Sequence, residues 1–179
     1  MTSKSMELLG CIVFTAMAAA TPKGMVAQER PIQVALVNPI QIFPEDQSIR
    51  GLRLNILYGR NASVTGLDIG LVNHTTAPSA GLQYGLVGLA DSDFRGWQNH
   101  LVNVTKGRFE GFQSGVVNFV GNGEGFQWGV VNHAETMSGL QLSLVNYTKN
   151  MNGVQIGLIN IITSKDKFPI LPIVNWNFQ

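Results

Sequence analysis

Histidine is the residue type with the widest chemistry in this chain, because it can bind a metal ion or exchange a proton near neutral pH. The chain has three, His74, His100 and His133. His74 and His133 each follow an asparagine of a repeated motif, and His100 has a different place in its repeat. A metal site needs three or four ligands that converge on one point. Residues so far apart in the repeats predict no metal site.

Two glutamates are the next candidates. Glu110 and Glu124 each precede the first glycine of successive repeats, and Arg95 has the same place one repeat earlier. Two neighbouring carboxylates can bind a cation or share a proton. The interpretation that we favour is a solvated edge on which Arg95 offsets Glu110, in a pair worth less than about 1 kcal/mol.

Sequence motifs for catalysis or cofactor binding are missing. The chain has no GxSxG, no HExxH and no phosphate-binding loop. The glycine-rich run 121–125 precedes a repeat and lacks the strand-to-helix context of a nucleotide site. We therefore expect no enzymatic activity and no cofactor.

The elements that would position any of these residues belong to one repeated unit, whose clearest copy is Gly-Val-Gln-Ile-Gly-Leu-Ile-Asn at 153–160. After one interval of 20 residues, the units start 14 or 15 residues apart. Such a short and regular period is typical of stacked repeats. The first residues of the units, which we call position zero, are Pro31, Gly51, Gly66, Gly81, Gly96, Gly111, Gly125, Gly139, Gly153 and Phe168.

Equivalent positions of the units carry the same residue types. Position two is mostly Gln, position four is mostly small, positions five and six are aliphatic, and position seven is mostly Asn. Side-chain amides that stack in register can hydrogen-bond continuously along the stack. The predicted ladder residues are Gln83, Gln98, Gln113, Gln127, Gln141 and Gln155, with Asn73, Asn103, Asn118, Asn132, Asn146 and Asn160.

Short apolar runs bounded by Gly, Asn and Ser predict strands, and no helical spacing persists in the repeats. The predicted fold is an all-β solenoid of about ten repeats; an antiparallel β-barrel or meander is the alternative. Adjacent positions five and six point to opposite faces of a flat strand, yet both are aliphatic. Either the chain bends between them or both faces are covered.

Some units depart from the pattern. Tyr58 and Gly88 interrupt the Asn column, and Arg53 and Asp68 interrupt the Gln column, so continuity of the ladders is in question in the first regular coils. An aromatic column at position one, Trp97, Phe112 and Phe126, can either fill the core or bind sugar rings, and we expect core filling.

The chain divides into four parts. Residues 1–27 resemble a secretory signal peptide, with a buried or membrane-anchoring helix as the alternative. Residues 28–50 hold the first repeat and a proline-containing insertion that we expect to cap the stack or form a loop, 51–163 the regular repeats, and 164–179 a C-terminal capping repeat. The only cysteine, Cys11, lies in a lipobox-like sequence but is expected to leave with the signal peptide.

Composition limits the function. The chain has 179 residues, 45% of them hydrophobic and 13% charged, with a net charge of +1. These values are typical of a single β-rich domain. A nearly neutral chain gives no indication of nucleic-acid binding.

The units at 66–73, 111–118 and 153–160, together with the closing Phe-Pro-Ile-Leu-Pro-Ile-Val-Asn at 168–175, resemble bacterial exported surface-repeat proteins built from GxQxGLVN units. The resemblance covers about four fifths of the chain and implies an exported Gram-negative envelope protein without established enzymatic activity. We therefore expect a structural or interaction protein at the cell surface, in the outer membrane or in the periplasm. Its partner would be an unknown protein or envelope component or further copies of itself, with membrane association possible. A small outer-membrane β-barrel is the alternative function.

Overall fold

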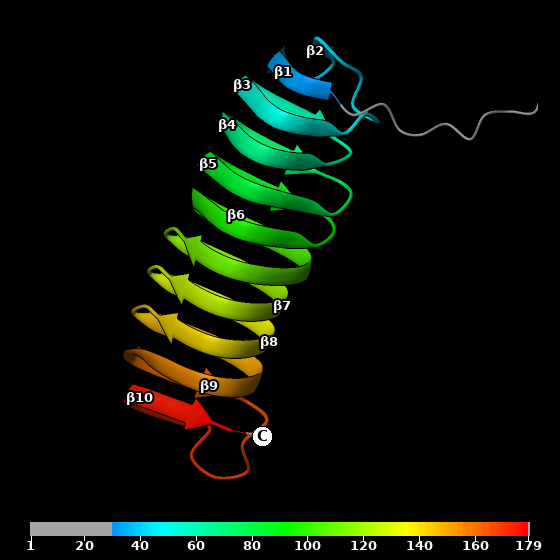
Figure 1. Ribbon diagram of the computed structural model, residues 1–179. Helices are drawn as coiled ribbons and strands as arrows, with labels where there is room; N and C mark the ends of the chain where they lie inside the picture. Colours follow the sequence, from blue (N-terminus) through cyan, green and yellow to red (C-terminus); the bar gives the residue numbers. More distant parts are fainter. Residues whose placement is uncertain (1–29, 179) are drawn as a thin grey trace, which may run out of the picture.

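The structure is a computed structural model that describes residues 30–178. The expected signal peptide, residues 1–27, and Cys11 lie outside the described residues. Over the described residues the chain winds into a stack of coils, drawn in Figure 1 from blue at one end to red at the other. The strands are β1 (Arg30–Val37), β2 (Ile40–Gln41), β3 (Ile49–Asn61), β4 (Val64–Thr75), β5 (Ser79–Ala90), β6 (Phe94–Ser114), β7 (Val117–Trp128), β8 (Val131–Leu142), β9 (Val145–Ile162) and β10 (Ile170–Asn177).

The strands form a β-solenoid. From β3 to β9 each strand pairs in parallel with the next, and equivalent repeat positions lie side by side, as in Gly66 with Gly81 and Gln83 with Gln98. The sheet has two ends, at β10 and at β2, and does not close. The structure therefore confirms the predicted all-β solenoid, and the alternative of an antiparallel barrel or meander is wrong.

The glycine at position zero is required by the close approach of successive coils. Gly96 has a φ of 133°, and a Cβ atom added there would lie 2.1 Å from the carbonyl oxygen of Gly81 in the preceding coil. Only glycine accepts both the conformation and the contact. We name each coil by this residue.

The chain bends at position five. In the pairing of β5 with β6, Gly85 lies beside His100 and Val87 beside Val102, but Leu86 has no partner in the ladder. Leu86 is exposed and Val87 partly exposed, so both point outward around a corner, and the next residue, Gly88, is buried. Of the two explanations for adjacent aliphatic positions, the bend is the one that the structure shows.

The interior combines a small apolar cluster with the polar columns. Phe94 and Phe109 stack in it with ring centroids 6.2 Å apart. The described interior also holds twenty-four buried polar or charged residues, among them all twelve residues of the predicted ladder. The apolar cluster consists of Ala90, Phe94, Phe109, Val120, Ala134, Met137, Met151 and Ile162.

The first end of the stack is covered by the insertion after β1. Strand β2 pairs antiparallel with β1. Gln33 donates from Nε2 to the Phe43 carbonyl oxygen at 2.8 Å and accepts from the Phe43 N–H at 3.0 Å. The insertion is thereby held against the first coil.

The other end differs from the sequence-based expectation. The last unit contains an asparagine in the repeat position, Asn175, but β10 runs antiparallel to β9 and brings Asn175 opposite Gln155. Trp176 remains 52% exposed, and the Lys165 ammonium lies 5.6 Å from its ring centroid. The last unit is thus a reversed strand rather than a further coil.

Candidate functional site

Hydrogen bonds run along the predicted Gln column. Each glutamine from Gln98 to Gln155 donates from Nε2 to the Oε1 atom of the glutamine in the preceding coil, over 2.7 to 2.9 Å. Thr105 and Thr148 donate to the same oxygen atoms of Gln98 and Gln141. A net contribution of about 1 kcal/mol per bond is modest, but each buried amide left without a partner costs about 1–3 kcal/mol. The ladder therefore selects the in-register stack.

The Asn column runs in the opposite direction. Asn103, Asn118, Asn132 and Asn146 each donate from Nδ2 to the Oδ1 atom of the asparagine in the following coil, at 2.8 to 3.1 Å. Backbone carbonyls take further N–H bonds, as at Trp128 from Asn118. The two ladders thus point their donors toward opposite ends of the same coils.

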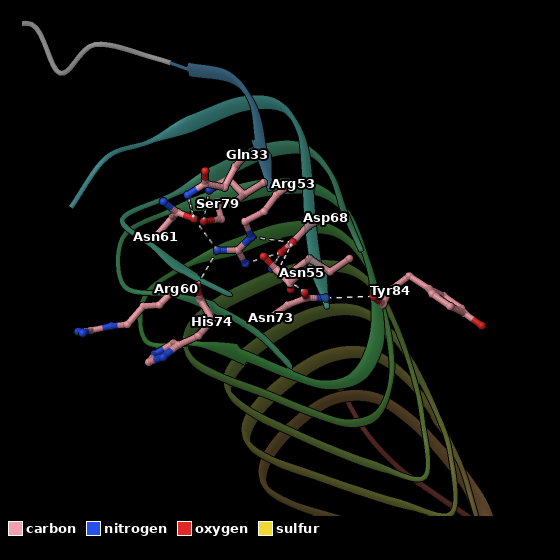
Figure 2. A network of polar contacts seen from close by, with 12 residues as sticks. Gln33, Arg53, Asn55, Arg60, Asn61, Asp68, Asn73, His74, Ser79 and Tyr84 are labelled. Carbon is pink, nitrogen blue, oxygen red and sulfur yellow. Dashed lines mark hydrogen bonds and ion pairs between the residues drawn. The ribbon is translucent and has the colours of Figure 1, made fainter. Parts of the chain in front are cut away.

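Arg53 and Asp68 do not interrupt the Gln network. Figure 2 shows Arg53 pointing inward between Asn61 and Asp68. Its guanidinium makes two bonds of 2.7 Å to the Asp68 carboxylate, which also accepts from Gln83 Nε2 at 3.0 Å. Both side chains are almost completely buried. Charged residues therefore continue the column that glutamine builds elsewhere.

His100 spans the gap that Gly88 leaves in the Asn column. Asn73 Nδ2 lies 3.0 Å from His100 Nε2, and His100 Nδ1 lies 2.7 Å from Asn103 Oδ1. Since the amide N–H of Asn73 must donate and Asn103 Oδ1 must accept, the ring is neutral with its proton on Nδ1. Burial lowers the pKa of His100. An asparagine at 88 would collide with the ring, because even a Cβ there would be 2.5 Å from it.

A second gap in the Asn column, at Gly59 in an earlier coil, is filled in the same way. Gly59, not Tyr58, lies beside Asn73 in the ladder, because an extra residue enters β3 between Asn55 and Tyr58. The prediction that Tyr58 interrupts the Asn column is therefore wrong by one position. Asn55 Nδ2 donates to Asn73 Oδ1 at 2.8 Å from position four, the position His100 also occupies. The donor chain is continuous from Asn55 to Asn160.

Tyr58 belongs to a hydrogen-bonded row on the coil exterior. Its hydroxyl lies 2.8 Å from His74 Nδ1, His74 Nε2 lies 2.7 Å from Asp91 Oδ2, and Asp91 Oδ1 lies 2.7 Å from Lys106 Nζ. Burial raises the pKa of Tyr58, which keeps the hydroxyl protonated and a donor. The row resembles an acid–base relay, and sequence analysis missed it because its members come from different repeats. These contacts join side chains of four successive coils.

The other predicted chemical candidates stay apart. His133 stacks between Phe119 and Tyr147, with centroid distances of 4.5 and 4.8 Å. Arg95 and Glu110 form an exposed pair at 3.3 Å, and Glu124 pairs with Arg108. Across residues 30–178, no three His, Cys, Asp or Glu side chains are grouped so as to hold a metal ion.

The aromatic column at position one lies outside the coils, so the expected core filling is wrong. Trp97 is 41% exposed, and Phe112 and Phe126 are partly exposed. The rings form a row, with centroids 5.6 Å apart from Trp97 to Phe112 and 5.1 Å apart from Phe112 to Phe126. Gln at position two points inward, and the aromatic residue before it must then point outward.

The columns at positions one, three and five form a continuous apolar surface, which we call the outer face. Its members come from nearly every coil of the described chain, and none is charged between the Gly51 and Gly153 coils. Monomeric proteins rarely expose a contiguous apolar patch beyond a few hundred Å². The more exposed members include Leu54, Ile56, Leu67, Ile69, Leu71, Tyr84, Leu86, Trp97, Leu101, Val116, Trp128, Val130, Leu142, Leu144, Ile156 and Leu158.

The outer face has a hollow of about 410 Å³ near its middle. Trp97 and Phe112 line one side and Trp128 and Val130 the other. Asn99 and Ser114 lie between them, in the position-three column that carries bulky residues in neighbouring coils. Ser114 Oγ accepts from Trp97 Nε1 at 3.1 Å. The hollow exists because two small polar side chains interrupt an otherwise apolar column.

These features define a β-solenoid with hydrogen-bonded polar columns inside and an apolar face outside. No family model, curated protein or solved structure matches the chain. Within residues 30–178 no helix has the length and apolar character needed to cross a membrane.

Proposed function

We propose that the protein is an exported structural or interaction protein of the bacterial cell envelope that binds through its outer face. The observation that carries this proposal is the uncharged apolar surface along the coils. Apolar side chains contribute about 25 cal/mol per Å² when a partner removes them from water. We therefore assign this exposed apolar surface as the binding surface for a partner.

Export is the second part of the proposal, and it rests on the sequence of residues 1–27 and on the resemblance to exported repeat proteins. The interior supports a structural role rather than a catalytic one. Its buried polar groups are committed to ladders between coils, as in the Gln98–Gln83 and Asn118–Asn132 bonds.

Fractionation of a Gram-negative host that expresses the full chain tests this function. Residues 18–20, Ala-Ala-Ala, fit the small-residue site of signal-peptide cleavage, and a second site follows Ala27. We expect a shortened chain, cut after Ala20 or Ala27, in the envelope fraction. Val116→Lys places a charge in the middle of the outer face and should release the folded protein from that fraction. Asn122→Lys adds the same charge at an exposed position away from the face and should not. A full-length cytoplasmic chain, or equal behaviour of the two variants, would contradict the proposal.

A further inference from the structure

The outer face is long enough to make a stable interface. The eight coils from Gly51 to Gly153 are separated by seven steps of about 4.8 Å and span roughly 34 Å, and positions one to five at about 3.3 Å per residue span roughly 15 Å. The flat footprint is therefore roughly 500 Å², and the accessible area of its corrugated side chains is larger. A standard interface buries about 800 Å² per partner. Two such faces together would bury at least roughly 1,000 Å², which is the lower limit for a specific interface.

The charges beside the face favour a protein partner over a lipid surface. Arg95, Glu110 and Glu124 follow one another along the edge next to position one and form exposed ion pairs with neighbouring side chains. Binding to an anionic membrane calls for a clear excess of Lys and Arg. The mixed edge, with a net charge of +1 for the whole chain, lacks that excess.

The shape of the face points to the partner. Trp128 is 56% exposed and protrudes beside the hollow that Asn99 and Ser114 leave in the same column. In the position-three column between the Gly51 and Gly153 coils, these two are the only small polar residues. Tyr84 in the same column is similarly exposed, at 55%, but Trp128 is the aromatic side chain that directly lines the depression. Trp128 and the small side chains of Asn99 and Ser114 are displaced from each other along the stack.

We propose that the outer face binds a second copy of this chain, in an antiparallel dimer whose two-fold axis crosses the Gly111 coil. The proposal rests on the proposed function, which assigns the outer face as the binding surface. In this arrangement Trp128 lies opposite the partner's Asn99 and enters the partner's hollow, and the reverse contact follows from symmetry.

The rest of the face fits the same axis. Coils at equal distances from the Gly111 coil face each other. Apart from Asn99, which meets Trp128, and Ser114, which meets its own copy, apolar or aromatic positions then meet apolar or aromatic positions. Phe112 meets the partner's Phe112, Leu86 meets the partner's Leu144, and Ile69 meets the partner's Ile156. A parallel dimer would instead press Trp128 against the partner's Trp128 and leave the two hollows facing each other, unfilled.

Sedimentation of the purified full chain without detergent tests the association. We expect twice the 19.4 kDa mass of one chain at micromolar concentration. Val116 lies on the proposed axis, so Val116→Lys buries two like charges and should weaken the dimer at least about a hundredfold. Asn122→Lys should remain dimeric. Thermal melting of both variants separates a lost interface from a lost fold.

Cross-linking tests the register. In a Cys11→Ser background, a short bis-maleimide that spans the roughly 10 Å between packed sheets should link Ser114→Cys to itself. Leu86→Cys and Leu144→Cys should each link poorly alone but efficiently when mixed. Links within the Leu144→Cys variant alone, with none in the mixture, would overturn the antiparallel arrangement.

Other occupants give distinct results. The wild type could instead be a monomer that binds neutral phosphatidylcholine vesicles, with that binding abolished by Val116→Lys. This result would overturn the dimer in favour of lipid binding but leave the proposed function standing. A monomer that still needs Val116 for envelope association would overturn the dimer in favour of another protein. A monomer whose envelope association is absent, or unaffected by Val116→Lys, would overturn both proposals.

Discussion

The coils from Gly111 to Asn160 and those from Gly51 to Asn103 make the same interior with different residues. The later coils use Gln at position two and Asn at position seven throughout. The earlier coils use an Arg53–Asp68 ion pair and fill two glycine gaps with Asn55 and His100. In the later coils each amide of the columns donates to the neighbouring coil, and in the earlier coils His100 joins Asn73 to Asn103 across the coil between them. What the stack requires is an unbroken chain of hydrogen bonds, and the residue type is secondary.

The ion pair offers the largest test of this comparison. Asp68→Asn leaves the buried guanidinium of Arg53 without its counter-charge, and we expect a loss of about 3–5 kcal/mol in the free energy of unfolding. The double variant Arg53→Gln/Asp68→Gln gives the early coils the glutamines of the later ones and should be close to the wild type. Urea denaturation measures both. If the double variant is as unstable as the single one, the two regions are not equivalent.

The gap at Gly88, which His100 fills, gives a test of the Asn column. His100→Gly removes one hydrogen-bond partner each from Asn73 and Asn103 and leaves a cavity, which should cost about 2–4 kcal/mol. Adding Gly88→Asn to this variant places an asparagine where the later coils have one and should recover most of the loss. Gly88→Asn alone collides with the ring and should destabilise. Thermal melts of the three variants measure these effects. Equal melting temperatures of His100→Gly and Gly88→Asn/His100→Gly would contradict the ladder explanation.

A smaller effect concerns pH. Burial lowers the pKa of His100 from its ordinary value of 6.5, so the unfolded chain takes up a proton at a higher pH than the folded one. The stability from neutral His100 is present above that value and decreases as the pH falls below it, toward the lowered folded pKa. His133 has a lowered pKa as well, also through burial, and remains in Gly88→Asn/His100→Gly. We therefore expect the free energy of unfolding to fall less steeply below about pH 6.5 in that variant than in the wild type. Urea denaturation at several pH values measures this. Identical pH profiles of the two proteins would contradict the assignment of this effect to His100.

The smallest effect belongs to the edge of the coils. Arg95 and Glu110 are exposed and form a single ion pair at 3.3 Å. Glu110→Gln should change the free energy of unfolding by less than about 1 kcal/mol. A loss comparable to that of Asp68→Asn would show that the charged edge, and not only the interior, joins the coils.

The sequence predicted the solenoid because a constant period and repeated polar columns leave few other folds. It did not show which apolar positions face outward, because an aromatic residue such as Trp97 can occupy position one whether its side chain lies in the core or on the surface. The direction follows from Gln98, which must point inward to hydrogen-bond. The His100 replacement was also hidden, because the ring belongs to one repeat and the gap at Gly88 to the repeat before it. The reversal of β10 depends on the final loop, which no column describes.

The opposed orientation of the two amide ladders has an electrical consequence. Each aligned row of side-chain amides carries a dipole along the stack axis, as peptide groups do in a helix. The positive pole of the Gln row points to the first coils and that of the Asn row to the last, so the two largely cancel. The Asp68 carboxylate takes up the remaining N–H end of the Gln row. Each further coil of this kind therefore adds little to the net dipole of the side-chain amides along the stack.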